Sequence, residues 1–321
     1  MPKTCSEVSL PASRRTLHGP TMGTRWSVTL DEAPEDSLDR LQAALSGAVA
    51  EVDHQMSPWR ADSDLVRFNE APVGAWVTLP EAMTQVLARA LDVARWSDGA
   101  FDPTVGALVD AWGFGAARDT PDGAAIVAAR AAARGGPGHR ALELDVGARR
   151  ARKLAPLQLD LCGIAKGFAV DRMVERLRGH GIERALVALD GELRALGGQR
   201  DGHGWPVAVE QPEPGRRAAH SVLELRDIAV ATSGDYRRFF TLQGERIAHT
   251  MDPRRAAPLR NEVAAVTVLA PECMSADAWA TALLVVGADD GMALAGRHGL
   301  EAMFLLRSDG ALVAQGCGAF A

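Results

Sequence analysis

Residues 157–181, LQLDLCGIAKGFAVDRMVERLRGHG, contain the clearest strand-to-helix signal in the chain. The apolar run 157–161 predicts a short buried strand that leads into a turn between two glycines. A helix is expected from that turn to about Arg178, because glycines follow shortly after it and end the helical pattern. This stretch therefore predicts a strand packed beside a helix, and the rest of the chain has to supply their neighbours.

The turn within this stretch is also the first candidate for chemistry. The expected strand ends on Asp160, and Lys166 stands where the helix begins. A turn of this kind presents backbone N–H groups at the positive end of a helix, which favours a phosphate or another anion. A plain strand-to-helix turn with a solvated lysine is the alternative, since a short Gly-x-x-x-Gly pattern is a weak signal by itself.

Strand and helix patterns follow one another outward from this stretch without strict alternation. Helices are expected over residues 38–56, 80–97, 120–134 and 275–286. Strands are expected over residues 25–30, 185–189, 207–210, 221–225, 228–232, 264–269, 304–306 and 311–314, with a hairpin turn at Asp309-Gly310. Such a mixture indicates an α+β fold with mixed or antiparallel sheets and packed helices.

The domain organisation is expected to be simple. Residues 1–19 are polar and predict a flexible leader, and residues 20–321 predict a single domain. The leader has no apolar core of the kind that secretory signals carry, so the sequence as written indicates a cytoplasmic protein. A periplasmic location is the alternative if a leader has been removed.

Composition narrows the function classes. The chain has 321 residues, 47% of them hydrophobic and 24% charged, with a net charge of −6. A globular protein fits these values, whereas nucleic-acid binding has no electrostatic support, because phosphate-backbone binders carry a basic surplus. No segment reaches the roughly 18 consecutive apolar residues of a membrane span. The four cysteines form no C-x-x-C pair, so a zinc site is not indicated.

Two further groups of residues could carry chemistry. Asp277 and Thr281 are four residues apart on an expected helix and share one face. Their oxygen atoms are the hard ligands that Mg²⁺ prefers, although a helix-capping carboxylate beside a buried threonine is the alternative. His249 precedes Asp252-Pro253 and could act as a general base toward a hydroxyl, or could be a hydrogen-bonded structural histidine.

Taken together, seven segments resemble the ApbE family of FAD:protein FMN transferases, in the family's order and over about residues 20–320. They read T-M-G-T-R-W (21–26), M-S-P-W-R-A-D-S-D-L-V-R-F-N (56–69), F-D-P-T-V-G-A-L-V-D-A-W-G-F (101–114), D-L-C-G-I-A-K-G-F-A-V-D (160–171), A-T-S-G-D-Y (231–236), H-T-M-D-P-R (249–254) and A-D-A-W-A-T (276–281). One such segment would be weak, but seven in order are specific.

The resemblance implies a T-fold-like α+β architecture that binds FAD, with Mg²⁺ held against the pyrophosphate. By the family pattern, the metal ligands are Asp277, Thr281 and the backbone carbonyl of Gly163, and His249 is the base. The residues expected to contact FAD are Met22, Ser57, Asp102, Asp160, Lys166 and Met251.

The implied reaction is Mg²⁺-dependent transfer of FMN from FAD to a threonine or serine hydroxyl of a target flavoprotein, with release of AMP. The acceptor is expected to carry a motif like Asp-x-x-Thr/Ser-Gly-Ala-Thr/Ser. Hydrolysis of FAD to FMN and AMP is one alternative, and FAD binding without turnover is another.

The sequence departs from the family pattern at two turns. Family members follow the His-x-x-Asp-Pro segment with Arg-Thr-Gly, whereas this chain has Arg254-Arg255-Ala256. A family Gly-Gly-Asp turn is replaced by Asp190-Gly191-Glu192. The first change is expected to affect the turn beside the base and the docking of the target, and the second changes the length of a carboxylate.

Overall fold

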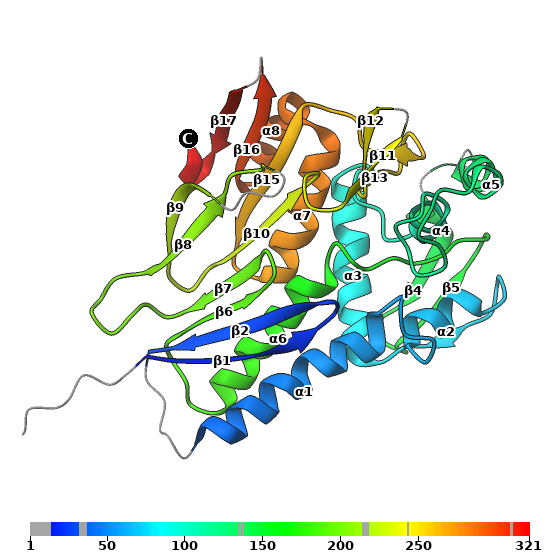
Figure 1. Cartoon of the computed structure of the whole chain (residues 1–321). Coiled ribbons are helices and arrows are strands. Elements are labelled where there is room, and N and C mark those ends of the chain that lie inside the picture. The colour runs from blue at the N-terminus through cyan, green and yellow to red at the C-terminus, as the bar shows by residue number, and fades with distance from the viewer. Residues whose placement is uncertain are drawn as a thin grey trace, which may run out of the picture.

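An eight-stranded sheet forms the centre of the molecule (Figure 1). The computed structural model describes residues 14–31, 37–133, 136, 138–213, 218–242, 244–308 and 311–321. In the sheet the strands lie in the order β1 (Arg15–Thr21), β2 (Thr24–Leu30), β6 (Ala185–Leu189), β7 (Glu192–Leu196), β10 (Ala229–Gly234), β15 (Val263–Ala270), β16 (Glu301–Ser308) and β17 (Ala311–Cys317). Every neighbouring pair is antiparallel, which confirms the expected α+β fold with antiparallel sheets.

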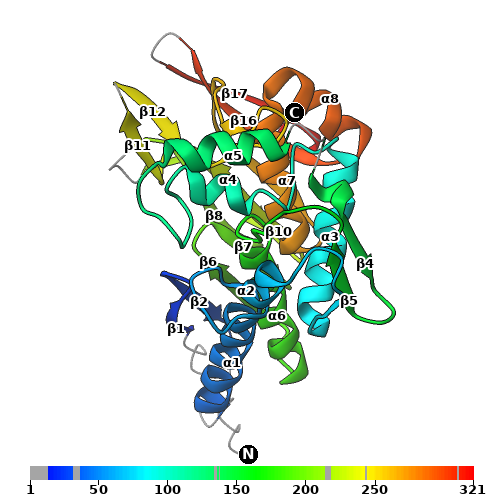
Figure 2. The same ribbon diagram turned by 90° about the vertical axis from the view of Figure 1, so that its right-hand side faces the viewer.

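Helices cover one face of this sheet. The long ones are α1 (Leu38–Met56), α3 (Glu81–Trp96), α6 (Ala165–Gly179), α7 (Cys273–Val286) and α8 (Ala288–Arg297). α6 packs on β6 and β7, α7 packs on β10 and β15, and α1 and α3 lie against these two helices (Figure 2). The inward faces form one continuous apolar core that runs from Trp26 to Leu306. Among the described residues, no helix combines the length and apolar character needed to cross a membrane.

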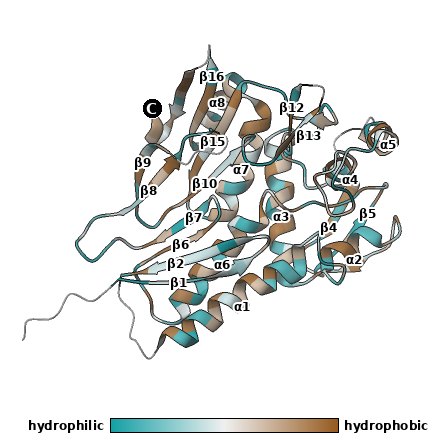
Figure 3. Ribbon diagram, in the orientation of Figure 1, coloured by the Kyte–Doolittle hydropathy of each residue, from teal (hydrophilic) through white to brown (hydrophobic). Residues whose placement is uncertain are grey.

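The opposite face of the sheet is partly covered by a separate hairpin of β8 (Trp205–Glu210) and β9 (Ala219–Leu225). Trp205 and Val207 of β8 pack on Ala195, Val230 and Leu269 of the main sheet. Brown apolar segments accordingly meet between the layers in Figure 3, while teal polar segments face outward. The central strands are thus buried from both sides.

Smaller elements surround one end of the sheet. They are α2 (Asp64–Glu70), α4 (Gly106–Ala111), α5 (Gly123–Ala133), the three-stranded sheet of β3 (Val77–Thr78), β4 (Leu142–Asp145) and β5 (Arg150–Lys153), and the hairpins of β11 (Phe239–Leu242) with β12 (Glu245–Ala248) and β13 (Met251–Asp252) with β14 (Ala257–Pro258).

The expected leader is too long. Residues 15–19 belong to β1, which pairs along its whole length with β2, and residues 1–13 lie outside the described part of the chain. The sequence pattern did not reveal β1 because this strand lies at the edge of the sheet and needs few apolar side chains. An edge strand also tolerates a proline such as Pro20, which has no N–H to donate. β16 and β17 pair as expected, while the turn residues Asp309 and Gly310 lie outside the described residues.

The expected strand at residues 157–161 is also wrong. Only a single parallel bridge forms there, between Gln158 and Val105. The side-chain amide of Asn69 satisfies the neighbouring backbone instead. Its Oδ1 accepts from the N–H of Leu159 at 2.7 Å, and its Nδ2 donates to the carbonyl of Leu159 at 3.0 Å. A side chain therefore supplies the hydrogen bonds that a partner strand would have made.

Candidate active site

One cavity of about 940 Å³ lies where α7, the start of α6 and the end of β10 meet. This volume is near the upper end of the usual range for small-molecule sites. All ten residues that the sequence singled out line this cavity: Met22, Ser57, Asp102, Asp160, Gly163, Lys166, His249, Met251, Asp277 and Thr281. They come from segments up to 259 residues apart (22 to 281), so only the folded chain brings them together.

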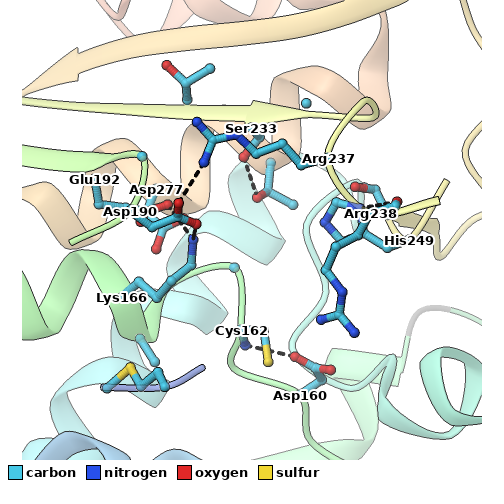
Figure 4. Close-up of a pocket in the computed structure, with 18 of the residues that line it drawn as sticks. Asp160, Cys162, Lys166, Asp190, Glu192, Ser233, Arg237, Arg238, His249 and Asp277 are labelled. Carbon is cyan, nitrogen blue, oxygen red and sulfur yellow. Dashed lines mark hydrogen bonds and ion pairs between the residues drawn. The ribbon is translucent and has the colours of Figure 1, made fainter. Parts of the chain in front are cut away.

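The expected metal ligands are adjacent. Asp277 and Thr281 stand one helical turn apart on α7, and both face the cavity (Figure 4 labels Asp277). The hydroxyl of Thr281 lies 3.0 Å from that of Ser233. Gly163 approaches so closely that a Cβ built on it would lie 3.2 Å from the Thr281 hydroxyl. A larger residue at position 163 would therefore crowd the candidate metal site.

Helices α6 and α7 cap each other beside this pair. The Asp277 carboxylate accepts a hydrogen bond of 3.0 Å from the N–H of Gly167, in the first turn of α6. In return, Asp171 of α6 accepts from the N–H groups of Cys273 and Met274, at 2.9 and 2.8 Å, in the first turn of α7. Carboxylates are stabilised at helix N-termini, so this exchange locks the position of Asp277.

The same hydrogen bond bears on the anion site that the sequence suggested at the turn before α6. The amide of Gly167 is already occupied by Asp277, and that of Cys162 donates to Asp160 at 2.7 Å. The amide of Ala165 donates to the carbonyl of Leu161. These three backbone donors are therefore committed within the protein and do not bind an anion.

Negative charge accumulates around Asp277. Lys166 donates to Glu192 at 2.7 Å and lies 3.6 Å from Asp190. The other Glu192 oxygen is buried and has no hydrogen-bond partner within the described residues. Burial, and after it the charge of Glu192, raises the pKa of Asp277 to about 8. Once Asp277 is ionised, the carboxylates of Asp277, Glu192, Asp190 and Glu210 outnumber the cations Lys166 and Arg237, and a bound cation would neutralise the surplus.

The donor set fits Mg²⁺. The described residues contain no cluster of three or more His, Cys, Asp or Glu side chains arranged around a metal position. A mixed set of one carboxylate, one hydroxyl and one backbone carbonyl is nevertheless suitable for Mg²⁺, which keeps several waters and binds through few protein oxygens. The buried, partnerless Glu192 oxygen adds an acceptor that a metal-bound water could satisfy.

Burial lowers the pKa of Lys166, but the carboxylates of Glu192, Asp277 and Asp190 outweigh this effect, and the net direction is upward. Lys166 therefore stays protonated at neutral pH, with its charge already shared between two carboxylates. The sequence did not predict this pairing, because it suggested Lys166 either as an anion-binding group or as a solvated lysine.

His249 is held by its neighbour Arg238. The backbone carbonyl of Arg238 accepts from the His249 N–H and lies 3.1 Å from its Nδ1. A carbonyl can only accept, so Nδ1 carries the proton and Nε2 keeps its lone pair. Burial lowers the pKa of His249 to about 4. The imidazole is therefore neutral near pH 7 and able to take a proton from a hydroxyl.

The two aspartates expected to contact FAD differ in accessibility. The Asp102 side chain is 2% exposed and accepts from the backbone and side chains of Thr104 and His139. Its carboxylate therefore holds the cavity wall together. Asp160 accepts from the N–H of Cys162, and burial raises its pKa. Because the Asp102 carboxylate is engaged, only the backbone of Asp102 is available for a ligand. The Asp160 side chain, in contrast, faces the cavity (Figure 4).

Among the residues of this cavity to which sequence reasoning gave no role are Trp59, Glu192 and Arg238. Trp59 is 54% exposed, unusual for so large an aromatic side chain, and the Arg238 guanidinium lies 5.9 Å from its ring. A tryptophan in the polar M-S-P-W-R loop was an available signal. The roles of Glu192 and Arg238 had no local signal, because they depend on distant partners.

Comparison with known proteins places the whole chain in one family. Residues 22–304 match the ApbE family. The chain is 36% identical over 300 residues to the FAD:protein FMN transferase of Vibrio cholerae, covering 93% of this chain and 89% of the relative. It is 33% identical over 311 residues to the enzyme of the same name from Klebsiella pneumoniae, covering 94% and 88%.

Solved structures agree as well. The flavin transferase ApbE of Vibrio cholerae superposes with a TM-score of 0.86 at 34% identity, over 97% of this chain and 99% of the other. The apo form of the Pseudomonas stutzeri flavinyl transferase ApbE superposes with a TM-score of 0.84 at 36% identity, over 96% of both chains. On its sequence and its fold, this chain belongs to the ApbE family.

Proposed function

We propose that this protein transfers FMN from FAD to a threonine or serine hydroxyl of a target flavoprotein, with Mg²⁺ as cofactor. The main support is that ten residues from distant segments, matching the family pattern, line one cavity. In this reaction the target hydroxyl attacks the phosphorus on the FMN side, the pyrophosphate bond breaks, and AMP leaves. Such transfer needs positioning and charge neutralisation more than covalent help from the enzyme.

The base in this proposal is His249. Its Nδ1 is occupied by the Arg238 carbonyl, so Nε2 takes the proton of the attacking hydroxyl. Because the imidazole is already neutral near pH 7, no proton has to be removed from it beforehand.

Mg²⁺ would be held by Asp277, Thr281 and the carbonyl of Gly163, and when bound it neutralises charge on the pyrophosphate oxygens. Lys166 keeps its charge and holds Glu192 and Asp190 in place. The mutual capping of α6 and α7 keeps Asp277 oriented toward the cavity.

The test is incubation of the protein with FAD, Mg²⁺ and flavoproteins carrying the motif Asp-x-x-Thr/Ser-Gly-Ala-Thr/Ser. Flavin fluorescence that stays on the denatured target, together with AMP in solution, is the expected result. FMN and AMP formed at a useful rate without any target would indicate a FAD pyrophosphatase instead. FAD that is bound but stays intact with all components present would indicate a non-catalytic FAD-binding protein.

A further inference from the structure

The cavity contains more cations than the proposed reaction has used. Four cationic side chains line it: Arg60, Lys166, Arg237 and Arg238. A phosphate gains most from a cation whose charge is not already committed to a carboxylate, since exchange of one partner for another gains little. The ion pairs of these four side chains therefore indicate which of them is available.

Two of the four share a chain of carboxylates. Lys166 is paired with Glu192 at 2.7 Å and lies 3.6 Å from Asp190. Arg237 is paired with Asp190 at 2.6 Å and also with Glu210. Figure 4 shows Arg237 and Lys166 meeting at Asp190. Both cations therefore stabilise the cavity wall.

The third cation, Arg60, is also paired with carboxylates, one of which belongs to the cavity lining. Arg60 lies 2.9 Å from Asp62 and 3.7 Å from Asp53. Arg238 differs from the other three, because it forms no ion pair with any carboxylate in the described parts of the chain. Its guanidinium donates to the carbonyl of Phe114 at 3.4 Å, a long hydrogen bond, and lies near the Trp59 ring. Within the described residues, that hydrogen bond is the one polar contact of the guanidinium, so most of its donors have no protein acceptor there.

The position of Arg238 suits a phosphate. Its side chain extends from the His249 segment toward Asp160 across the cavity (Figure 4). Its own backbone carbonyl holds His249 at both the backbone N–H and Nδ1. One residue thus orients the base and projects a guanidinium into the same space. Guanidinium groups bind phosphate oxygens through two parallel hydrogen bonds.

We propose that Arg238 is the side chain that binds the pyrophosphate of the flavin nucleotide. This inference rests on the proposed function, since it names the protein group that meets that substrate's phosphates. It assigns Lys166 the supporting role of holding Glu192 and Asp190, and Arg238 the direct one.

The test measures binding in the absence of turnover. Dissociation constants for FAD and for riboflavin, which has no phosphate, are measured by flavin fluorescence without Mg²⁺ for wild type, Arg238→Gln and Arg238→Lys. The control is Arg130→Gln, which removes an exposed arginine of α5 outside the cavity. We expect Arg238→Gln to weaken FAD binding about 10-fold or more, in the range of a lost charge-assisted contact. Riboflavin binding should stay within 2-fold, and Arg238→Lys should recover part of the FAD affinity.

The backbone carbonyl that holds His249 is present in every variant, so these substitutions change the guanidinium without removing the support of the base. An Arg238→Gln protein with unchanged FAD affinity would overturn the inference. An equal loss of FAD and riboflavin affinity would overturn it too, because the side chain would then act on the flavin ring beside Trp59. An equal effect of Arg130→Gln would show a general charge effect and would overturn the inference. Failure of the wild type to bind FAD both with and without Mg²⁺ would instead contradict the proposed function itself.

Discussion

At the scale of single residues, burial and one backbone carbonyl set the chemistry of His249. Burial disfavours the imidazolium, and the Arg238 carbonyl selects the tautomer. The His249 imidazole is therefore neutral at neutral pH, and a backbone carbonyl rather than a carboxylate orients it. Asp277 is the converse case, because the same physical effect raises the pKa of its carboxyl group and prepares a site that a cation stabilises.

His249→Ala should lower the rate of FMN transfer by about 10²–10⁴-fold, the usual contribution of a general base. FAD binding should change little, since the residue acts on the acceptor hydroxyl. Transfer is measured as flavin fluorescence on the denatured target, and binding by fluorescence titration. The exposed His220→Ala serves as control and should transfer at the wild-type rate. A His249→Ala enzyme within a few-fold of wild type would exclude this histidine as the base.

Asp277→Ala should lose Mg²⁺-dependent transfer by at least about 100-fold, because a bound metal contributes several kcal/mol of charge stabilisation. The circular dichroism spectrum should stay close to that of wild type, since the carboxylate lines a cavity and is not part of the apolar core. Asp290→Ala removes an exposed helical carboxylate on α8 and is the matched control. Unchanged Mg²⁺ dependence in Asp277→Ala would contradict the metal assignment.

At the scale of elements, the two departures from the family pattern are turns that keep their backbone shape without the usual glycine. Asp190, between β6 and β7, has a φ of 55°, and Ala256, between β13 and β14, has a φ of 48°. Both values lie in the left-handed region that favours glycine. Asp190 gains from its pairing with Arg237, as aspartate tolerates this region well. Ala256 has no such compensation from its side chain, so the β13–β14 turn is retained under strain.

Ala256→Gly should therefore stabilise the protein by roughly 0.5–1 kcal/mol, since relief of left-handed strain exceeds the added entropy of the unfolded chain. Chemical denaturation monitored by circular dichroism measures this change. Ala128→Gly, at an exposed position in α5, is the opposite control and should destabilise by up to about 1 kcal/mol. Equal destabilisation by both substitutions would show that the turn at Ala256 is unstrained.

At the scale of the whole molecule, antiparallel pairing across the sheet determines which segments share the cavity. β7 and β10 are neighbours in the sheet, and α7 packs on β10, so Glu192, Ser233 and Asp277 converge from three distant parts of the chain. Buried charges concentrated at one such point make the stability of the entire fold depend on pH and on cations.

Without metal, the protein should become less stable as pH rises from about 6.5 to 8. Folding raises the pKa of Asp277 from 3.8 to about 8, so the protonated carboxyl group stabilises the folded state. This stabilisation is complete below pH 3.8 and is lost as the pH rises through about 8. The lowered pKa of His249 acts in the opposite direction, but its contribution is complete above 6.5. Thermal unfolding of the metal-free protein in EDTA at several pH values measures this trend.

Mg²⁺ should reverse the trend, because the metal binds the deprotonated carboxylate. The rise in melting temperature on adding Mg²⁺ should be larger at pH 8.5 than at pH 6.5. Asp277→Asn, which cannot ionise, should lose most of this pH dependence. A Mg²⁺ effect that is equal at both pH values, or equal in Asp277→Asn, would argue against a cation at this carboxylate.

Local order along the chain was enough to predict helices α1, α3, α6 and α7 and the strands around residues 185–189 and 264–269. The resemblance to the family supplied the set of ten residues that line one cavity. Hydrophobic periodicity and motif spacing depend only on residues that are close together in the sequence. The edge strand β1 and the Asn69 bonds to Leu159 were not readable in this way. Ion pairing could not be predicted either: Lys166 is neutralised by Glu192, 26 residues away, while Arg238 has no carboxylate partner among the described residues. Electrostatic partners depend on distance in space, and only tertiary packing sets that distance.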